Sequence, residues 1–422
     1  MTGNLDFPRA RHGQPITIEG ACVALGPEER TWGVIEIGEG RITRISRHDR
    51  GKRAPALIDL TGYLVMPGLI NAHDHLEFSL YPRLAHPPHR NYVDWGDDIH
   101  RRFPGVIAKQ HAMPRSVRLW WGGIRNLLCG VTTVCHHDPL WPELRRPDFP
   151  VRVAQEYGWA HSLALGGDLP ALRRATPASR PFIVHACEGV DEVAGKELWE
   201  LNRLGVVDAG TVLVHGLAIG KEGITLLNDR KASLIVCPSS NCFLFGLTPE
   251  PALFTKVGRV ALGNDSPLTA AGDLLDEIRF AIDRCEVSPQ AALCMVTSAP
   301  ATMLRLENGE GAIQESGFAD FIAVRDSGAT AAETLRNLSA GDVEFVMIGG
   351  QVQLASQPVL ERLPRPLRQG LEPISVGGVA RCLRAPVRRL LSEAEAILGD
   401  NGVRLSGRTV SAPASVTAIY VY

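Results

Sequence analysis

The stretch LVMPGLINAHDH, residues 64–75, decides how the rest of the chain is interpreted. It is an apolar run that ends in His73 and His75, two positions apart. A continuous apolar run is typical of a strand that is buried on both faces of a parallel sheet. Because side chains alternate along a strand, both imidazoles project to the same side. The stretch predicts a buried parallel strand whose two histidines are either metal ligands or an incidental pair.

Further apolar runs follow this one, and longer stretches of helical pattern separate them. Alternating strands and helices predict βα units. A long series of such units favours a closed (β/α)₈ barrel of the TIM type over an open sheet. Seven strands are clear, and the weak fourth one in chain order is HSLALGG, residues 161–167. The other runs occupy residues 131–138, 151–158, 181–189, 211–220, 232–241 and 259–267.

The two flanks of this series are rich in short, β-branched runs. We predict an α/β chain in which the barrel occupies residues 65–306, and in which residues 1–64 and 307–357 pair into a small composite β-sandwich domain. Residues 358–422 are rich in arginine and contain one helical stretch, residues 387–399. This C-terminal extension suggests either a solvated helix face or an anion-binding patch.

The overall composition limits the function classes. The 44 basic and 46 acidic residues give a net charge of −2, which argues against nucleic acid as a partner. No apolar run approaches the ~18–20 residues of a membrane span, and the opening MTGNLDFPRARHGQP lacks the apolar core of an export signal. We therefore expect a cytoplasmic protein. Its nine cysteines include no CxxC pair, so neither a disulfide framework nor a thiolate zinc site is expected.

Three further strand ends carry residues that can bind metal or transfer protons. His185 ends one run with Glu188 three residues later, His215 ends the next, and Asp265 ends the last. Barrel strands bring their C-terminal ends to one mouth, where imidazoles and a carboxylate can surround an open metal position. Any single one could instead be a core histidine or, for Asp265, a helix cap. Together they favour a metal-dependent hydrolase.

Several motifs in this order resemble the metal-dependent amidohydrolase superfamily, in particular its cytosine deaminase, guanine deaminase and chlorotriazine hydrolase branch. The motifs are MPGLINAHDH, GVTTV, HACE, LVHG, CPSSN, ALGNDS, TSAPATMLRL and GFADFIAV, and the resemblance covers roughly residues 16–354. It implies that the metal ligands are His73, His75, His185 and Asp265, that Glu188 is a proton shuttle, and that His215 supports the ligands or stabilises an oxyanion.

The chemistry of these residues agrees with the roles that the resemblance implies. A divalent ion lowers the pKa of bound water from 15.7 towards ~7, and Asp265 can both touch the ion and accept the proton of that water. Glu188 can protonate a ring nitrogen and then the leaving amine. We therefore expect Glu188, His215 and Asp265 to be catalytic.

The scarcity of lysine bears on the number of metal ions. Binuclear members of the resembled superfamily use a carboxylated lysine, or sometimes an acid, from the fourth barrel strand. The chain has six lysines, and none of them lies between Cys135 and Pro181. We expect a single divalent ion, most simply zinc, with iron or manganese as alternatives. Glu156 is the nearby acid to examine.

Candidate substrate contacts lie in two segments after the first strands. His136, His137 and Asp138 follow the second strand; at least one of them faces the substrate, or the pair of histidines only begins a loop. The long segment after the first strand resembles a loop that contacts substrate in the related enzymes. It holds Arg83, a potential partner for an anionic group, and Trp95.

The leading function is hydrolytic deamination of an aminated heterocycle, such as a purine, pterin or pyrimidine, by a metal-activated water. The alternatives are hydrolysis of a cyclic amide such as an imidazolone, and hydrolytic removal of a substituent from a triazine ring. A catalytically silent binding protein is a third reading. The expected partner is a small heterocyclic substrate, and the resemblance implies a homodimer.

Overall fold

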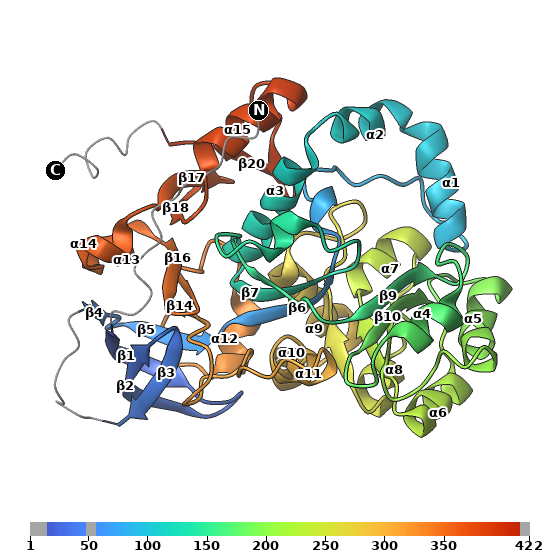
Figure 1. Ribbon diagram of the computed structural model, residues 1–422, viewed down its shortest axis with the longest axis horizontal. Coiled ribbons are helices and arrows are strands. Elements are labelled where there is room, and N and C mark those ends of the chain that lie inside the picture. Colours follow the sequence, from blue (N-terminus) through green and yellow to red (C-terminus); the bar gives the residue numbers. More distant parts are fainter. Residues whose placement is uncertain (1–14, 48–55, 414–422) are drawn as a thin grey trace.

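Two parallel sheets form the centre of the molecule (Figure 1). The computed structural model describes residues 15–47 and 56–413. Within these residues, a three-stranded sheet contains β6 (Leu69–Asp74), β7 (Val131–His136) and β8 (Arg152–Val153). A five-stranded sheet follows, in the order β13 (Val260–Leu262), β12 (Ser233–Val236), β11 (Thr211–His215), β10 (Phe182–Ala186) and β9 (Gly158–Ser162). All neighbouring strands in both sheets run parallel.

The predicted parallel α/β arrangement with a flanking domain is confirmed. Across the described residues the two sheets are not joined into one closed sheet. The last strand nevertheless lies beside the first, because the backbone N–H of Asp265 donates to the carbonyl of His73 at 3.1 Å. The weak fourth strand lies a few residues earlier than predicted, at Gly158–Ser162, since the chain turns at Gly166 and Gly167.

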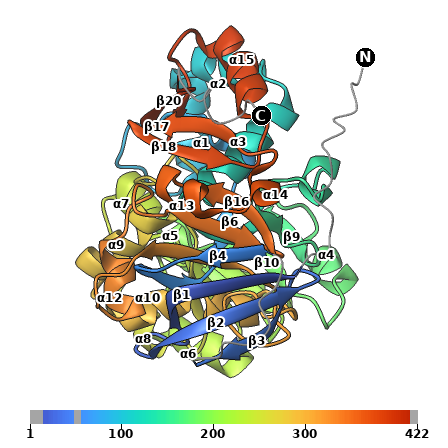
Figure 2. The same cartoon turned by 90° about the vertical axis from the view of Figure 1, so that its left-hand side faces the viewer.

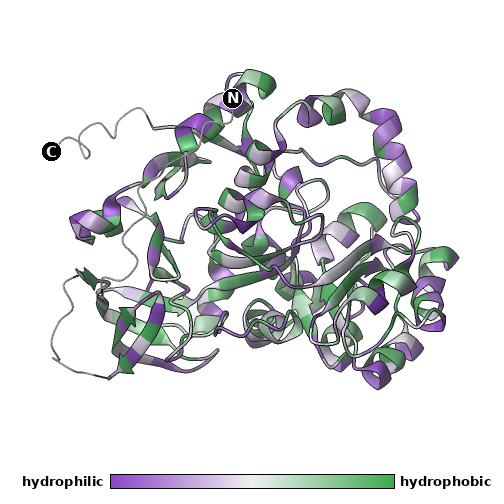
Figure 3. Cartoon of the chain, viewed as in Figure 1, coloured by the Kyte–Doolittle hydropathy of each residue, from purple (hydrophilic) through white to green (hydrophobic). Residues whose placement is uncertain are grey.

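Helices follow most of the strands and cover them, and Figure 3 shows hydrophilic residues on their outward faces. Aspartates cap three of them: Asp168 caps α4, Asp191 caps α5 and Asp273 caps α9. The helices of this part are α3 (Arg115–Leu128), α4 (Leu169–Ala175), α5 (Glu192–Arg203), α6 (Lys221–Arg230), α7 (Pro238–Phe245), α8 (Pro251–Lys256), α9 (Leu274–Cys285), α10 (Pro289–Met295) and α11 (Ser298–Met303). None of the described helices is long and apolar enough to cross a membrane.

The segment between β6 and α3 forms an excursion over the strand ends. It contains a short 3₁₀ turn, η1 (Leu76–Phe78), and the helices α1 (Tyr92–Arg102) and α2 (Pro104–His111). A second 3₁₀ turn, η2 (Pro142–Arg145), follows β7. Asn91 caps α1 through its side chain. The excursion is the part of the chain in which Arg83 and Trp95 are predicted to meet a substrate.

The two flanks of the chain meet in one 12-stranded sheet. In sheet order its strands are β19 (Arg404–Leu405), β20 (Arg408–Ser411), β17 (Glu372–Val376), β18 (Val379–Leu383), β16 (Gln351–Ala355), β15 (Phe345–Ile348), β14 (Phe321–Arg325), β5 (Tyr63–Pro67), β1 (Ile16–Ala24), β2 (Arg30–Gly38) and β3 (Arg41–Ser46), with β4 (Ala56–Asp59) paired to β1. The central β5 runs parallel to β1 and antiparallel to β14. It continues through Gly68 directly into β6.

The C-terminal extension holds more structure than the one helix that its sequence indicates. Besides α13 (Gln357–Arg362), α14 (Arg365–Arg368) and α15 (Val387–Leu398), it adds β17, β18, β19 and β20 to the flanking sheet (Figure 2). Two of its arginines, the buried Arg381 and the half-buried Arg384, bind backbone carbonyls. Arg381 Nε donates to Val343 O at 2.8 Å, and Arg384 Nε donates to Val352 O at 2.8 Å. These two arginines therefore belong neither to a solvated helix face nor to an anion-binding patch.

One helix outside the extension completes the flanking part: α12 (Ala331–Asn337) follows β14 and is capped by Thr330. The opening segment, in which we expect no export signal, lies almost entirely outside the described residues.

Candidate active site

Four buried side chains converge at the ends of three strands. The Nε2 atoms of His73 and His185 lie 3.2 Å apart. Oδ1 of Asp265 lies 3.9 Å from Nε2 of His73 and 3.8 Å from Nε2 of His75. All four residues are at most 8% exposed. Three imidazole nitrogens and one carboxylate oxygen at such separations make a group that can hold a metal ion.

His137 orients His73 from behind. Nε2 of His137 lies 2.9 Å from the carbonyl of Ala160, so this nitrogen carries the proton. Nδ1 of His137 lies 3.3 Å from Nδ1 of His73 and accepts its proton. Nε2 of His73 is therefore left bare, as a metal ligand must be. Burial, together with the charge of His75, lowers the pKa of His137 to about 3, so the imidazole of His137 is neutral at neutral pH.

Asp138 performs the same task for His75. Its Oδ2 accepts the Nδ1 proton of His75 at 2.8 Å, which leaves Nε2 of His75 to face Asp265. Burial raises the pKa of Asp138, but the charge of His75, its hydrogen bond and the neighbouring His136 and His137 together outweigh burial, and the net pKa lies below its usual value. A carboxylate bonded to a ligand histidine fixes the tautomer and raises its basicity.

The substrate contacts predicted for His136 and His137 are not what the structure shows. Both ring nitrogens of His137 are engaged, so none is left for a substrate. His136 is fully buried, and its Nδ1 accepts from the backbone N–H of Leu76 at 3.2 Å. Nε2 of His136 therefore carries a proton, and it has no hydrogen-bond partner among the described residues.

The start of α7 holds Asp265 and His215. Ser240 and Thr269 donate their hydroxyls to Oδ2 of Asp265 at 2.8 and 2.9 Å, so Oδ1 is the atom that faces the histidines. Oδ1 of Asn241 accepts the Nδ1 proton of His215 at 3.1 Å. Asp265 and His215 both have a left-handed backbone, with φ of 54° and 76°. Such strain in residues other than glycine is typical of functional sites.

Glu188 lies against His215 beside the cluster. Its Oε2 is 3.5 Å from Nε2 of His215, and both residues are buried. Burial, together with the charges of Asp265 and Glu197, raises the pKa of Glu188 well above its usual value. Burial lowers the pKa of His215 to about 4. The raised pKa of Glu188 and the lowered pKa of His215 favour a protonated acid next to a neutral imidazole, an arrangement that is suited to proton delivery.

Comparison with known proteins adds to this geometry. Residues 160–353 match the amidohydrolase family. A 5-methylthioadenosine/S-adenosylhomocysteine deaminase of Syntrophobacter fumaroxidans is 26% identical, and the match covers 70% of this chain and 78% of the relative. Among solved structures, an adenosine deaminase from Xanthomonas campestris with bound zinc superposes with a TM-score of 0.68 at 18% identity, covering 90% of this chain and 97% of that one. The resemblance to the amidohydrolase superfamily is confirmed.

A second solved amidohydrolase-like structure supports the fold. An atrazine chlorohydrolase from Arthrobacter aurescens, complexed with zinc, superposes with a TM-score of 0.67 at 18% identity, covering 90% of this chain and 99% of that one. At this identity the likeness concerns the fold alone. The amidohydrolase family match includes His185, Glu188, His215 and Asp265, whereas the two histidines of β6 precede it.

The fourth strand contributes a histidine that sequence reasoning missed. The ring of His161, at the end of β9, lies 4.9 Å from that of His185, and its Nδ1 is 3.0 Å from Oγ of Ser162. If the fourth strand is placed at residues 158–162, His161 lies at a strand end, as the other candidate site residues do. It could have been predicted from that position. Glu156, the acid examined for a second ion, is instead 60% exposed at its side chain and pairs with Arg180.

Arg83 holds the excursion to neighbouring segments, whereas Trp95 forms a contact within it. Nε of Arg83 donates to the carbonyl of Ala270 at 2.7 Å, and its guanidinium lies 4.4 Å above the ring of Phe243. These contacts tie the excursion to α7 and to the loop after the ligand Asp265. Nε1 of Trp95 donates to the carbonyl of Leu84, which belongs to the excursion, at 2.8 Å. Substrate contact by either side chain stays a prediction.

Proposed function

We propose that this chain is a metal-dependent hydrolase that releases ammonia from an aminated heterocycle. The observation that supports this most is the convergence of His73, His75, His185 and Asp265 next to a protonated Glu188. The sequence relatives are named as deaminases of adenosine derivatives. A purine nucleoside is therefore the first substrate class to test, ahead of pterins and pyrimidines.

The donor set suits one divalent ion, and we propose zinc. His73 and His75 have their Nδ1 protons committed to partners, so their Nε2 atoms face the centre of the cluster, where a bound ion would displace the Nε2 proton of a charged His75. Borderline-soft imidazole and one carboxylate oxygen are typical zinc ligands. When bound, such an ion lowers the pKa of water towards ~7 and so supplies a nucleophile at neutral pH.

Two observations support one ion rather than two. Glu156 points away from the cluster, and no lysine lies between Cys135 and Pro181. A second group of potential ligands, Glu77, His136 and Asp138, lies nearby. The Nε2 atom of His136 carries a proton because its Nδ1 accepts from Leu76, and Asp138 is already bonded to His75. This second group therefore lacks a free imidazole lone pair.

The remaining residues handle protons. Oδ1 of Asp265 is the carboxylate atom free to take the proton of the attacking water, since Oδ2 is held by two hydroxyls. Glu188 can deliver its proton to the ring nitrogen, take a second proton from the hydroxyl group that the water adds to the ring carbon, and pass that proton to the leaving amine, so that ammonia departs neutral. The proton that Asp265 takes from the water then restores the acid form of Glu188. His215 keeps Glu188 oriented and presents a neutral imidazole beside it.

We also propose that the eight parallel strands close into a (β/α)₈ barrel over residues 65–306. The hydrogen bond from Asp265 N to His73 O supports closure between β13 and β6. Residues 1–64 and 307–357 would then form the composite β-sandwich domain, with residues 358–422 as an extension to it. A homodimer is part of the same proposal and rests on the resemblance alone.

The test is a panel of heterocycles incubated with the zinc-loaded protein. Aminated purine nucleosides, cytosine, guanine and pterins should release one ammonia per turnover if the chain is a deaminase. Ring opening of an imidazolone consumes substrate without releasing ammonia, and a chlorotriazine releases chloride. Protein that retains zinc but converts none of the aminated compounds would contradict the proposal.

Asp138→Asn tests the support of His75. Asparagine keeps the shape of the side chain but removes the charge that holds the Nδ1 proton. We expect zinc affinity, measured by competition with a chelator, to fall by about tenfold or more. Asp148→Asn is the matched control, because Asp148 pairs only with Arg146 in the same loop and is expected to bind zinc like the wild type. Equal affinity of the two variants would refute the role.

A further inference from the structure

A buried ion pair lies directly behind the proposed metal ligands. Asp74 stands between His73 and His75 in β6, so its side chain projects to the opposite face of the strand, towards α3. Nη2 of Arg125, from α3, lies 2.6 Å from both carboxylate oxygens of Asp74. The side chain of Asp74 is 0% exposed and that of Arg125 is 2% exposed.

The same guanidinium also reaches the other ligand strand. Nη2 of Arg125 donates to Oδ1 of Asn264 and to the carbonyl of Asp265, both at 3.2 Å. Its Nη1 donates to the carbonyl of Gly272 at 3.3 Å. One planar group therefore binds two segments. The first is β6, at the residue between its two histidines, and the second is the loop that begins with the ligand Asp265.

Asparagines complete this network. Nδ2 of Asn126 donates to Oδ2 of Asp74 at 2.6 Å. Nδ2 of Asn71 donates to Oδ1 of Asn126 at 2.9 Å and to Oδ1 of Asn264 at 3.0 Å. Every member is buried. A helix can pack on a sheet through apolar side chains alone, and a buried ion pair often adds little to stability. Its position next to three ligands points to a different task.

We propose that Arg125 is a positioning residue, which holds His73, His75 and Asp265 at the separation that one metal ion requires. It acts through the carboxylate of Asp74 and the carbonyl of Asp265. The inference rests on the metal site of the proposed function and extends it to a residue that touches neither ion nor substrate. Nη2 makes the contacts to both segments, and Nη1 binds the carbonyl of Gly272, so the planar guanidinium fixes Nη2 in place between β6 and the loop after Asp265.

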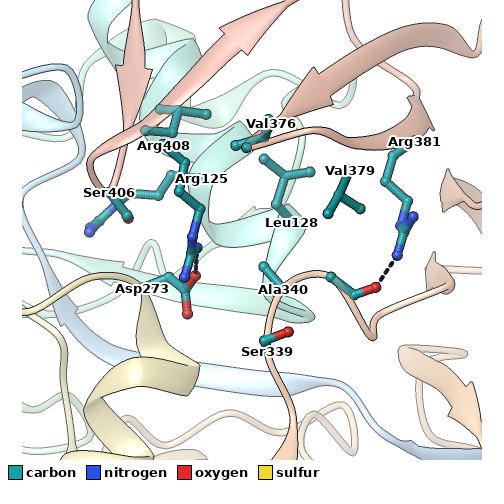
Figure 4. Close-up of a pocket in the computed structure, with 13 residues that line it drawn as sticks. Arg125, Leu128, Asp273, Ser339, Ala340, Val376, Val379, Arg381, Ser406 and Arg408 are labelled. Carbon is teal, nitrogen blue, oxygen red and sulfur yellow. Dashed lines mark hydrogen bonds and ion pairs between the residues drawn. The ribbon is translucent and has the colours of Figure 1, made fainter.

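A cavity beside Arg125 makes the proposal testable by rescue. Arg125 lines a cavity of about 150 Å³ between α3, the loop at residues 339–341 and the strands of the C-terminal extension (Figure 4). Nε of Arg125 is buried and has no hydrogen-bond partner among the described residues. Shortening the side chain to alanine enlarges this cavity, so that a free guanidinium ion can enter and pair with Asp74.

Arg408 supplies the matched control. It lines the same cavity, and its guanidinium lies 2.6 Å from Asp273 and 3.1 Å from Asp276. These carboxylates belong to the start of α9, not to a ligand strand. Arg408→Ala therefore removes a half-buried charge from the same wall without releasing β6 or Asp265.

The experiment measures the zinc affinity of wild type, Arg125→Ala, Arg408→Ala and Arg125→Lys by chelator competition. We expect a fall of about tenfold or more for Arg125→Ala, a smaller fall for Arg125→Lys, and no change for Arg408→Ala. Guanidinium, at concentrations far below those that unfold proteins, should restore the affinity of Arg125→Ala. Urea, which has a similar shape but no charge, should not.

Three outcomes would overturn the inference. They are wild-type affinity in Arg125→Ala, equal losses in Arg125→Ala and Arg408→Ala, and rescue by urea as effective as rescue by guanidinium. If Arg125→Ala does not fold, Arg125→Lys decides: zinc binding as tight as in the wild type would overturn it. Failure of the wild type to bind zinc is a separate result, which refutes the proposed metal site itself.

Discussion

His185→Ala is expected to remove the metal ion and the activity together. His185 supplies the nitrogen closest to His73, at 3.2 Å, and alanine leaves two imidazoles and a carboxylate at the site. Loss of the ion removes several kcal/mol of catalysis, so turnover should fall by about a thousandfold or more. Metal content measured on the purified variant, alongside ammonia release, checks both parts.

His100→Ala is the control for this variant. His100 is exposed on α1, and its ring nitrogen bonds only the carbonyl of Gly96 in its own helix. It should keep one equivalent of zinc and full activity. A His185→Ala protein that still holds one equivalent of zinc and turns over substrate at the wild-type rate would rule out His185 as a ligand.

Glu188→Gln is expected to separate chemistry from metal binding. Glutamine keeps the size of the side chain but cannot deliver the proton held on Oε2. General acid–base catalysis typically contributes 10²–10⁴-fold, so kcat should fall by about that factor while zinc stays bound. The unchanged metal content distinguishes this variant from His185→Ala.

Glu192→Gln provides the comparison on the same segment. Glu192 is 82% exposed at its side chain, pairs with Lys196 and lies in the first turn of α5. Its replacement should leave kcat unchanged. If Glu188→Gln retained the wild-type kcat, proton delivery would have to come from another group, and His161 would be the next side chain to replace.

The strand ends could be predicted from the sequence because each ligand sits at the end of an apolar run. That rule placed His73, His75, His185, His215 and Asp265, and the structure brings them together. It missed His161, whose strand contains a glycine, a histidine and a serine in place of a clear apolar run.

The supporting residues could not be found in this way. The bond between His137 and His73 joins positions 64 residues apart, and that between Arg125 and Asp265 joins positions 140 apart. No local pattern encodes such pairs, because they depend on which strands and helices become neighbours. The strands of the C-terminal extension were missed for a related reason: they are short, and they form by pairing with one another and, through β18, with β16.

The continuity of β5 and β6 has a practical consequence for dividing this protein. A single glycine, Gly68, separates the strand at the centre of the flanking sheet from the strand that carries two ligands. On Gly68, a Cβ would lie 2.2 Å from Oγ1 of Thr132, so the junction admits neither a linker nor a larger residue. Removing the N-terminal flank deletes β1, and removing the C-terminal flank deletes β14. Either removal leaves one edge of β5 unpaired and the start of β6 unsupported. The ligand-bearing half should therefore not survive excision as a minimal enzyme, and shortened versions must keep both β1 and β14.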